Sequence, residues 1–206
     1  MTAVDPEGRL LSYVVVRDYG FAPNPFFGSC TLATCKPGIR RTASEGDWIV
    51  GTTGSNKGTP RRVVFVMKVT SAMTFNEYWR HPTFQLKRPD LRSSLKYAFG
   101  DNIYRRDSTN RWRQLDSHHS HVDGRPNVNN IRRDTQADRV LISTEYRYWG
   151  GAGPKIPSRF REFDGYDIVA GRNYKSRFPK ALVRSFVEWI TTEFPNTGYL
   201  GEPGDW

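Results

Sequence analysis

The sequence is short of cysteine and has no long apolar run. Two of its 206 residues are cysteine, and in a cytoplasmic protein so few cysteines favour free thiols or ligands over a structural disulfide. No stretch approaches the roughly 18 apolar residues that a membrane-spanning helix needs. The N-terminal region carries Asp5 and Glu7 where a signal peptide would be basic. We therefore expect a cytoplasmic protein with no membrane partner.

Acidic residues are also in the minority. The chain has 21 Asp and Glu against 31 Lys and Arg, which gives a net charge of +10. A positive field of this size raises the local concentration of phosphates, so DNA or a nucleotide is the expected partner. A general solubilising charge is the alternative. Apolar residues make up only 37% of the chain but aromatic residues 14%, which favours a folded, surface-active protein over a disordered one.

The expected elements follow no regular alternation of strand and crossover helix. Runs of β-branched and aromatic residues predict strands at 10–16, 48–51, 62–70 and 140–149. The helices expected are one turn at 31–34, a short helix capped by Thr74 and a C-terminal helix from Pro179 to Phe194. This pattern predicts one α+β domain spanning residues 1–206, built on a small mixed or antiparallel sheet or on a small β-barrel.

Residues 89–138 form a long polar region without clear periodicity and with scattered aromatic residues. A structureless stretch of this length inside a compact domain is either functional or contains elements that the pattern does not reveal. We interpret residues 89–138 as an insertion or lid that lines or covers a site.

The stretch from Asp18 to Gly51 combines backbone constraint with aromatic and cationic side chains. Pro23, Pro25 and Pro37 fix φ at three points of this stretch. Aromatic faces beside positive charge can stack a base and hold its phosphates, although some of these aromatic residues are equally suited to a core. The candidate base- or nucleotide-binding residues are Tyr19, Phe21, Asn24, Lys36, Arg40, Arg41, Trp48, Tyr148 and Trp149.

Three carboxylates lie at the ends of expected strands, namely Asp18, Asp47 and Glu145. Rigid elements position catalytic carboxylates at such ends, while the neighbouring loops deliver the substrate. Asp47 is equally suited to a turn and Asp18 to capping a loop. We therefore take Asp18 and Glu145 as candidate catalytic acids or bases, and His121 as a candidate proton shuttle in the covering segment.

Cys30, Cys35 and the run from His118 to His121 offer the residue types of a zinc site. The cysteines are further apart, and further from the histidines, than the usual zinc signatures. We interpret them as a small buried cysteine and a solvated histidine run, and predict no metal. The sequence names no cofactor.

Several segments resemble the nucleotide modification associated domain 2 family of bacteria and phages. They are Asp18–Gly28, Cys30–Pro37, Ile39–Arg41, Gly46–Gly51, Met73–Trp79 and Tyr146–Gly151. The resemblance implies involvement in modified or hypermodified DNA bases and carries over no catalytic residue. The turn from Gly46 to Val50 is also similar to turns in small barrels of the PUA and EVE type, which hold bases in an aromatic pocket, so a PUA- or EVE-like β-barrel is one expected form of the sheet.

Together these observations predict a protein that modifies or binds a nucleobase of DNA, or a nucleotide, in a stacking pocket. As an enzyme it would be a transferase that decorates a base. A different class of function is a non-enzymatic reader that recognises a modified base by stacking and edge hydrogen bonds. A third is a basic nucleic-acid-binding scaffold that acts with other proteins of a DNA-modification or phage-defence system. The oligomeric state stays open.

Overall fold

A computed structural model describes residues 8–54 and 59–206 of the chain. The strands are β1 Leu10–Val15, β2 Cys30–Leu32, β3 Trp48–Thr53, β4 Val63–Lys68, β5 Ser71–Met73, β6 Tyr104–Arg106, β7 Trp112–Gln114, β8 Val140–Ser143, β9 Glu145–Tyr148, β10 Tyr174–Lys175 and β11 Gly198–Tyr199. The α-helices are α1 Pro37–Thr42, α2 Phe75–Arg80, α3 Leu95–Ala98, α4 Val128–Asp134 and α5 Lys180–Glu193. Short 3₁₀ helices are η1 Pro82–Lys87, η2 Gly150–Ala152 and η3 Ser158–Phe160.

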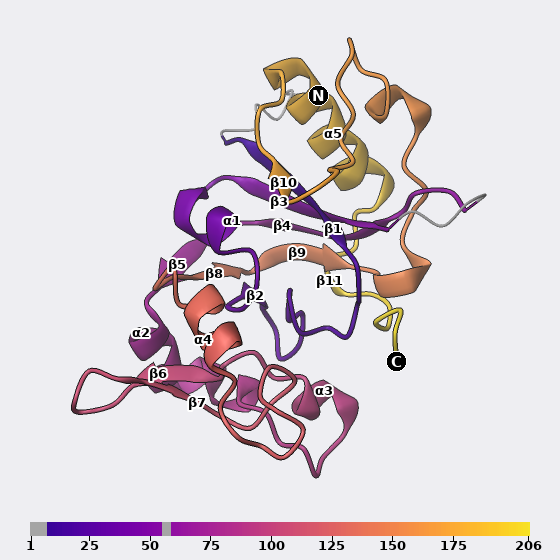
Figure 1. Cartoon of the computed structure of the whole chain (residues 1–206). Helices are drawn as coiled ribbons and strands as arrows, with labels where there is room; N and C mark the ends of the chain where they lie inside the picture. Colours follow the sequence, from indigo (N-terminus) through magenta and orange to yellow (C-terminus); the bar gives the residue numbers. More distant parts are fainter. Residues whose placement is uncertain (1–7, 55–58) are drawn as a thin grey trace.

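The central layer is a six-stranded mixed sheet with the strand order β10-β1-β3-β4-β9-β11. β1 pairs parallel with β3, and β9 with β11, whereas the other pairs are antiparallel. Helix α5 covers one face of this sheet (Figure 1), because its apolar stripe packs on Leu10, Val50 and Val66. The alternate residues Leu11 and Tyr13 point to the other face.

A smaller sheet of β2, β8 and β5 lies against that other face, with α1 beside it. A third layer packs on the small sheet and contains α2, η1 and the β6–β7 hairpin (Figure 1). Its core is aromatic, since Phe75, Tyr78, Phe84 and Tyr104 are buried there. Residues 118–133 of the polar region lie next to the loop that follows β1, which matters for the site.

The predicted α+β class and the C-terminal helix are confirmed. The expected PUA- or EVE-like barrel is wrong for the described residues, because both sheets are open. The reason lies at residues 140–149, which form two strands, since β8 pairs in the small sheet and β9 in the large one. Ser143 makes the change of sheet, because its hydroxyl donates to the Glu145 carbonyl and accepts from the Glu145 N–H.

Other local predictions have mixed outcomes. The capping box at Thr74 is confirmed, since Thr74 and Glu77 exchange side-chain and backbone hydrogen bonds. The helical turn predicted at 31–34 is wrong, because β2 pairs there with β8 and the helix begins only at Pro37. The small polar residues and glycines at 52–60 predict a loop, but β3 extends to Thr53, and residues 55–58 lie outside the described part. Within the described chain, every helix is too short or too polar to cross a bilayer.

Candidate functional site

A cleft of about 410 Å³ opens where β1 leaves the large sheet. Its volume lies within the range of about 300–1,000 Å³ that is usual for small-molecule sites. One wall is the end of β1 with Arg17, and a second is the loop 19–22. The remaining lining residues are Cys35, Lys36, His118, His119 and Arg133. The cleft therefore collects side chains from four separate parts of the sequence.

Cys35 enters this cleft from an unusual backbone position. Its φ is 55° and that of Lys36 is 39°, so two successive non-glycine residues adopt the left-handed conformation. The turn carries the chain from β2 into α1 and leaves the Cys35 side chain partly exposed. Strained backbone of this kind is concentrated at functional sites, where the surrounding structure holds it in place.

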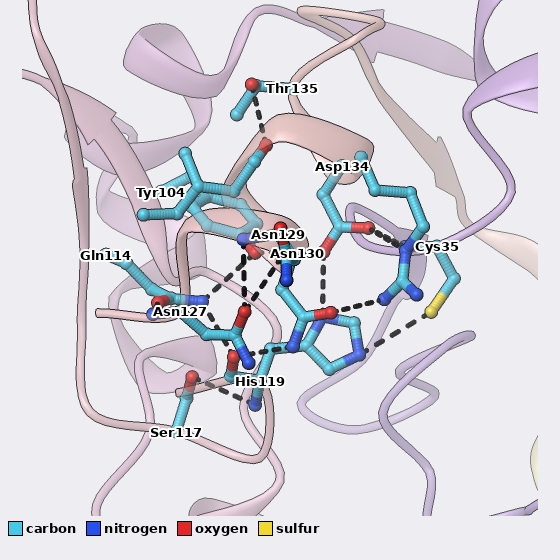
Figure 2. A network of polar contacts seen from close by, with 12 residues as sticks. Cys35, Tyr104, Gln114, Ser117, His119, Asn127, Asn129, Asn130, Asp134 and Thr135 are labelled. Carbon is cyan, nitrogen blue, oxygen red and sulfur yellow. Dashed lines mark hydrogen bonds and ion pairs between the residues drawn. The ribbon is translucent and has the colours of Figure 1, made fainter. Parts of the chain in front are cut away.

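His119 links Cys35 to a buried carboxylate, as Figure 2 shows. The Nε2 atom lies 3.7 Å from Cys35 Sγ. On the other side of the ring, Nδ1 lies 2.7 Å from Asp134 Oδ2. A thiol, an imidazole and a carboxylate in this order form a nucleophile, a base and a group that orients the base. The same order of groups recurs in cysteine-dependent enzymes on unrelated folds.

Asp134 is the last residue of α4 and is fully buried. Its Oδ2 also accepts a hydrogen bond from the Tyr104 hydroxyl at 2.9 Å, and its Oδ1 accepts from the backbone N–H of Cys35 at 3.0 Å. Gln114 of β7 donates to the His119 carbonyl at 3.0 Å, and Asn130 of α4 donates to the same carbonyl at 2.8 Å (Figure 2). His119 is thus held both by its ring, at Asp134, and by its backbone carbonyl, at Gln114 and Asn130.

The electrostatics of the pair favour an imidazolium facing a carboxylate. Burial disfavours the charged ring, but the hydrogen bonds to Asp134 and Cys35 outweigh it and raise the pKa of His119 to about 9. Burial likewise opposes the carboxylate, yet the bond from His119 holds the pKa of Asp134 below its usual value. At neutral pH the ring is therefore charged, with Nδ1–H donating to Asp134 and Nε2–H directed at the Cys35 sulfur.

Arg40 has a structural place in this arrangement. Its side chain is fully buried and donates to the carbonyls of Cys35, Ala137, Arg139 and Asp134. It therefore ties the turn at Cys35 to the end of α4. Burial lowers the pKa of Arg40 to about 10 although Asp134 opposes this effect. A side chain without exposed surface does not meet a phosphate, which was its expected role.

An aromatic wall, formed by Tyr19, Phe21 and His118, lines the same cleft as Cys35. The Tyr19 ring stacks on Phe99 with the centroids 5.0 Å apart, and the His118 ring meets Tyr19 and Phe21 edge-on at 4.9 and 5.2 Å. Burial, with the nearby charges of His119 and Arg17, lowers the pKa of His118, which favours its neutral, apolar ring. This wall contains two of the predicted stacking residues.

Cations complete the cleft. Lys36 Nζ lies 4.6 Å from the centroid of the Tyr13 ring, and burial lowers the pKa of Lys36. Arg17 and Arg133 are exposed at the mouth. Of the predicted binding residues, the structure brings Tyr19, Phe21 and Lys36 together in this cleft.

Other predicted residues lie deeper in the fold. Asn24 is buried, and its side-chain oxygen accepts a hydrogen bond from Lys87 Nζ at 2.7 Å. Tyr148 is also buried and donates its hydroxyl proton to Asp18. The Asp18 carboxylate accepts from the Gly204 N–H as well, so it joins the C-terminal residues to the end of β1. Burial raises the pKa of Asp18 although these bonds oppose it.

The last group lies away from the cleft. Trp48 and Trp149 pack on the α5 side of the large sheet, because the pleat directs them there. Glu145 pairs with Lys68, with Oε2 and Nζ 3.9 Å apart. His121 is exposed in a turn, where its N–H donates to the Arg125 carbonyl. Arg41 is exposed and donates to the Gln136 carbonyl.

The sequence reasoning missed the roles of Cys35, His119, Tyr104 and Asp134. It grouped Cys35 with Cys30, but Cys30 is fully buried in the core. The sequence shows a cysteine and a histidine run, but it does not show that Cys35 contacts His119, because 84 positions separate the two residues. The usable signal was a cysteine directly before a Lys-Pro-Gly helix start, together with a histidine run in a polar region.

The same residues could hold a metal ion. One ligand atom each from Cys35, His119 and Asp134 lies within 4.8 Å of the others. In the arrangement described, however, Cys35 and Asp134 face opposite nitrogens of the ring. A single ion bound by all three would use one ring nitrogen of His119, and the contacts on both nitrogens also suit proton transfer between Cys35 and Asp134.

Comparisons with known proteins agree with this setting. The family model described as nucleotide modification associated domain 2 matches residues 8–206. No curated protein and no solved structure matches the chain significantly. The family description associates the chain with nucleotide modification. Because the match covers nearly all of its length, the chain belongs to the nucleotide modification associated domain 2 family.

Proposed function

We propose that this protein is an enzyme that modifies a nucleobase, with Cys35 as its nucleophile. The observation that carries the proposal is the continuous contact from Cys35 Sγ through His119 to Asp134 at the wall of an open cleft. An imidazole in contact with a cysteine is the arrangement that activates a thiol as a nucleophile. The family membership supports a nucleotide as the substrate.

Each group has one role in this proposal. The Cys35 thiolate adds to an electron-poor carbon of the base, and the displaced electron pair moves to a ring oxygen or nitrogen. That atom takes the proton from His119 Nε2, which lies next to the sulfur. Asp134 keeps the ring oriented and favours its charged form. The neighbouring carbon of the base then attacks an electrophilic carbon of a donor, which forms the new bond and releases the donor's leaving group. The ring oxygen or nitrogen returns its proton to His119, and loss of the proton from the modified carbon expels the Cys35 thiolate.

The cleft offers complementary binding groups for such a substrate. Tyr19 and His118 present ring surface to a base, and the buried Phe21 supports the His118 ring from behind. Lys36, Arg17 and Arg133 supply positive charge for its phosphates. A non-enzymatic reader would use the same binding groups, but it has no need for a thiol held in left-handed backbone beside a buried His–Asp pair. We therefore favour the enzyme, acting as a transferase, over the reader and the scaffold.

Selective alkylation tests the nucleophile. We expect iodoacetamide to label Cys35 near neutral pH and to leave Cys30 unlabelled, since Cys30 is fully buried and burial raises its pKa. His119→Ala should slow the labelling by about tenfold or more, and nucleotides that occupy the cleft should protect Cys35. Equal labelling rates in wild type and His119→Ala, read by peptide mass spectrometry, would contradict the proposed pair.

Nucleoside mass spectrometry tests the activity itself. DNA from cells that express the chain together with its genomic neighbours should contain a modified nucleoside. The matched variant Cys35→Ala should remove that nucleoside, whereas Cys30→Ala should leave it in place if the protein folds. An unchanged nucleoside in the Cys35→Ala strain would exclude Cys35 as the nucleophile.

Metal analysis of the purified protein by mass spectrometry would reveal an ion at Cys35, His119 and Asp134, and stoichiometric zinc would replace the thiol mechanism by metal chemistry.

A further inference from the structure

A second positively charged site lies on the third layer, outside the cleft. Its centre is Trp79 of α2, beside which the β6–β7 hairpin packs. The guanidinium carbon of Arg88 lies 3.8 Å from the Trp79 ring centroid, and that of Arg105 lies 5.3 Å from it. The Arg88 side chain also donates to the Trp79 carbonyl at 2.6 Å. The indole thus gathers two guanidinium groups at one place.

No carboxylate neutralises these two groups among the residues that the structure describes. Burial, and then the charge of Arg105, lowers the pKa of Arg88, as expected for like charges that converge. The neighbouring Arg113 differs, because it pairs with Asp107 at 2.6 Å. Two adjacent, unneutralised guanidinium groups are suited to bind phosphate oxygens.

The surface beside them is hollow. A pocket of about 220 Å³ is lined by Trp79, Ile103, Arg105, Arg113, Gln114 and Leu115. Gln114 connects this pocket to the catalytic groups, because its side-chain amide donates to the Tyr104 hydroxyl at 3.2 Å and to the His119 carbonyl at 3.0 Å. The arginine site and the Cys35 cleft are therefore linked through Gln114, which lines the pocket and bonds to Tyr104 and His119.

We propose that Trp79, Arg88 and Arg105 bind the phosphodiester backbone of a single-stranded nucleic acid, so that the base entering the Cys35 cleft belongs to a strand. This inference rests on the proposed function for the identity of the cleft. A free nucleotide bound in the cleft would have no further phosphate to occupy the arginine site. A strand that places one base in the cleft carries further phosphates that need such a site. A base within a duplex would first have to leave the stack.

Salt-dependent binding tests the site. The full chain is titrated with a short fluorescein-labelled single-stranded DNA at several salt concentrations, and fluorescence anisotropy gives the affinity at each. Each phosphate contact contributes about 0.7 to the slope of log K against log salt for single strands. The pair Arg88→Gln with Arg105→Gln should lower the slope by about 1.4. Arg105→Gln alone, which leaves the Arg88 bond to the Trp79 carbonyl intact, should lower it by about 0.7.

Two arginines on the far side provide the matched control. Arg159 lies in η3 over the ring of Phe160, which belongs to the α5 core, and Arg172 lies in the loop before β10. The β6–β7 hairpin is at the opposite end of the molecule from α5 (Figure 1). Changing both to glutamine removes the same charge and should leave the slope unchanged. An equal fall in both double variants would overturn the proposal, because it would show that only the overall charge matters. An unchanged slope in Arg88→Gln with Arg105→Gln would also overturn it.

Binding of a free nucleotide shows whether Arg88 and Arg105 contact a strand or belong to the cleft. A deoxynucleoside monophosphate should bind wild type and the Arg88→Gln, Arg105→Gln variant equally, and a parallel loss would assign the two arginines to the cleft and overturn the proposal. Alkylation of Cys35 reads the proposed function separately. Normal Cys35 reactivity with an unchanged salt slope overturns the strand site alone. A reduced slope with no effect of His119 on Cys35 reactivity overturns the catalytic assignment and leaves the strand site supported.

Discussion

The backbone N–H of Cys35 donates to Asp134 Oδ1 at 3.0 Å, while the other carboxylate oxygen of Asp134 receives His119 Nδ1 at 2.7 Å. One buried carboxylate therefore positions both the backbone of the nucleophile and the ring next to it. This arrangement couples the left-handed turn at Cys35 to the end of α4. The contribution of each group to the reactivity of Cys35 or to the stability of the fold can therefore be tested by substitution.

Asp134→Asn should slow the alkylation of Cys35 by up to about tenfold, because an amide neither stabilises the imidazolium nor fixes its orientation as a carboxylate does. The amide oxygen can still accept the bond from the Cys35 N–H, so we expect the fold to persist. The rate of Cys35 alkylation at neutral pH is the measurement, with circular dichroism as the control of folding. A rate equal to that of wild type would show that Asp134 is only structural.

The contribution of His119 to the stability of the protein should fall on the alkaline side. The folded pKa of His119 is about 9, which is raised above the unfolded value of about 6.5. Its interaction with Asp134 is therefore fully present below about pH 6.5 and is lost as the pH rises through about 9. Because one pKa unit corresponds to about 1.4 kcal/mol, the free energy of unfolding should lose up to about 3 kcal/mol in this range. Denaturant unfolding at several pH values measures it, and His119→Gln should not show this loss.

Arg40→Met should destabilise the fold by about 3–5 kcal/mol, since it leaves the buried carbonyls of Cys35 and Asp134 without their donor. Arg41→Gln is the matched control, because Arg41 is exposed and its loss should change the free energy of unfolding by no more than about 0.5 kcal/mol. Chemical unfolding of both variants provides the comparison. Similar stabilities would show that Arg40 does not hold the turn.

Tyr19→Ala should weaken nucleotide binding by about 1–3 kcal/mol, the usual contribution of one stacked base, and should lower the free energy of unfolding by only about 0.5–1.5 kcal/mol through the lost contact with Phe99. Trp48→Ala should behave in the opposite way. Trp48 is 3% exposed in the α5 core, so its loss should lower the free energy of unfolding by about 3–5 kcal/mol. Isothermal titration with a nucleotide, at a temperature where both variants are folded, separates the two effects. Unchanged binding in Tyr19→Ala would remove the aromatic wall from the site.

How far the fold was predictable can be seen at residues 140–149. Their composition predicts extended structure, and both halves are strands. The division between two sheets depends on Ser143 and on partners elsewhere in the chain, which a local pattern does not contain. Cys30–Leu32 shows the same limit, because its pairing with β8 overrides the helical turn that its composition suggested.

The sequence by itself determined the α+β class, the capping box at Thr74, the C-terminal helix and the family, because these depend on local patterns and motifs. It also marked the Asp18–Gly51 stretch, from which Tyr19, Phe21, Cys35 and Lys36 reach the cleft. Only the tertiary structure decided which side chains meet there. His119 and Asp134 both belong to the polar region 89–138, and long-range packing brings them to Cys35. The pleat of β3 directs Trp48 to the α5 side of the large sheet, away from the cleft.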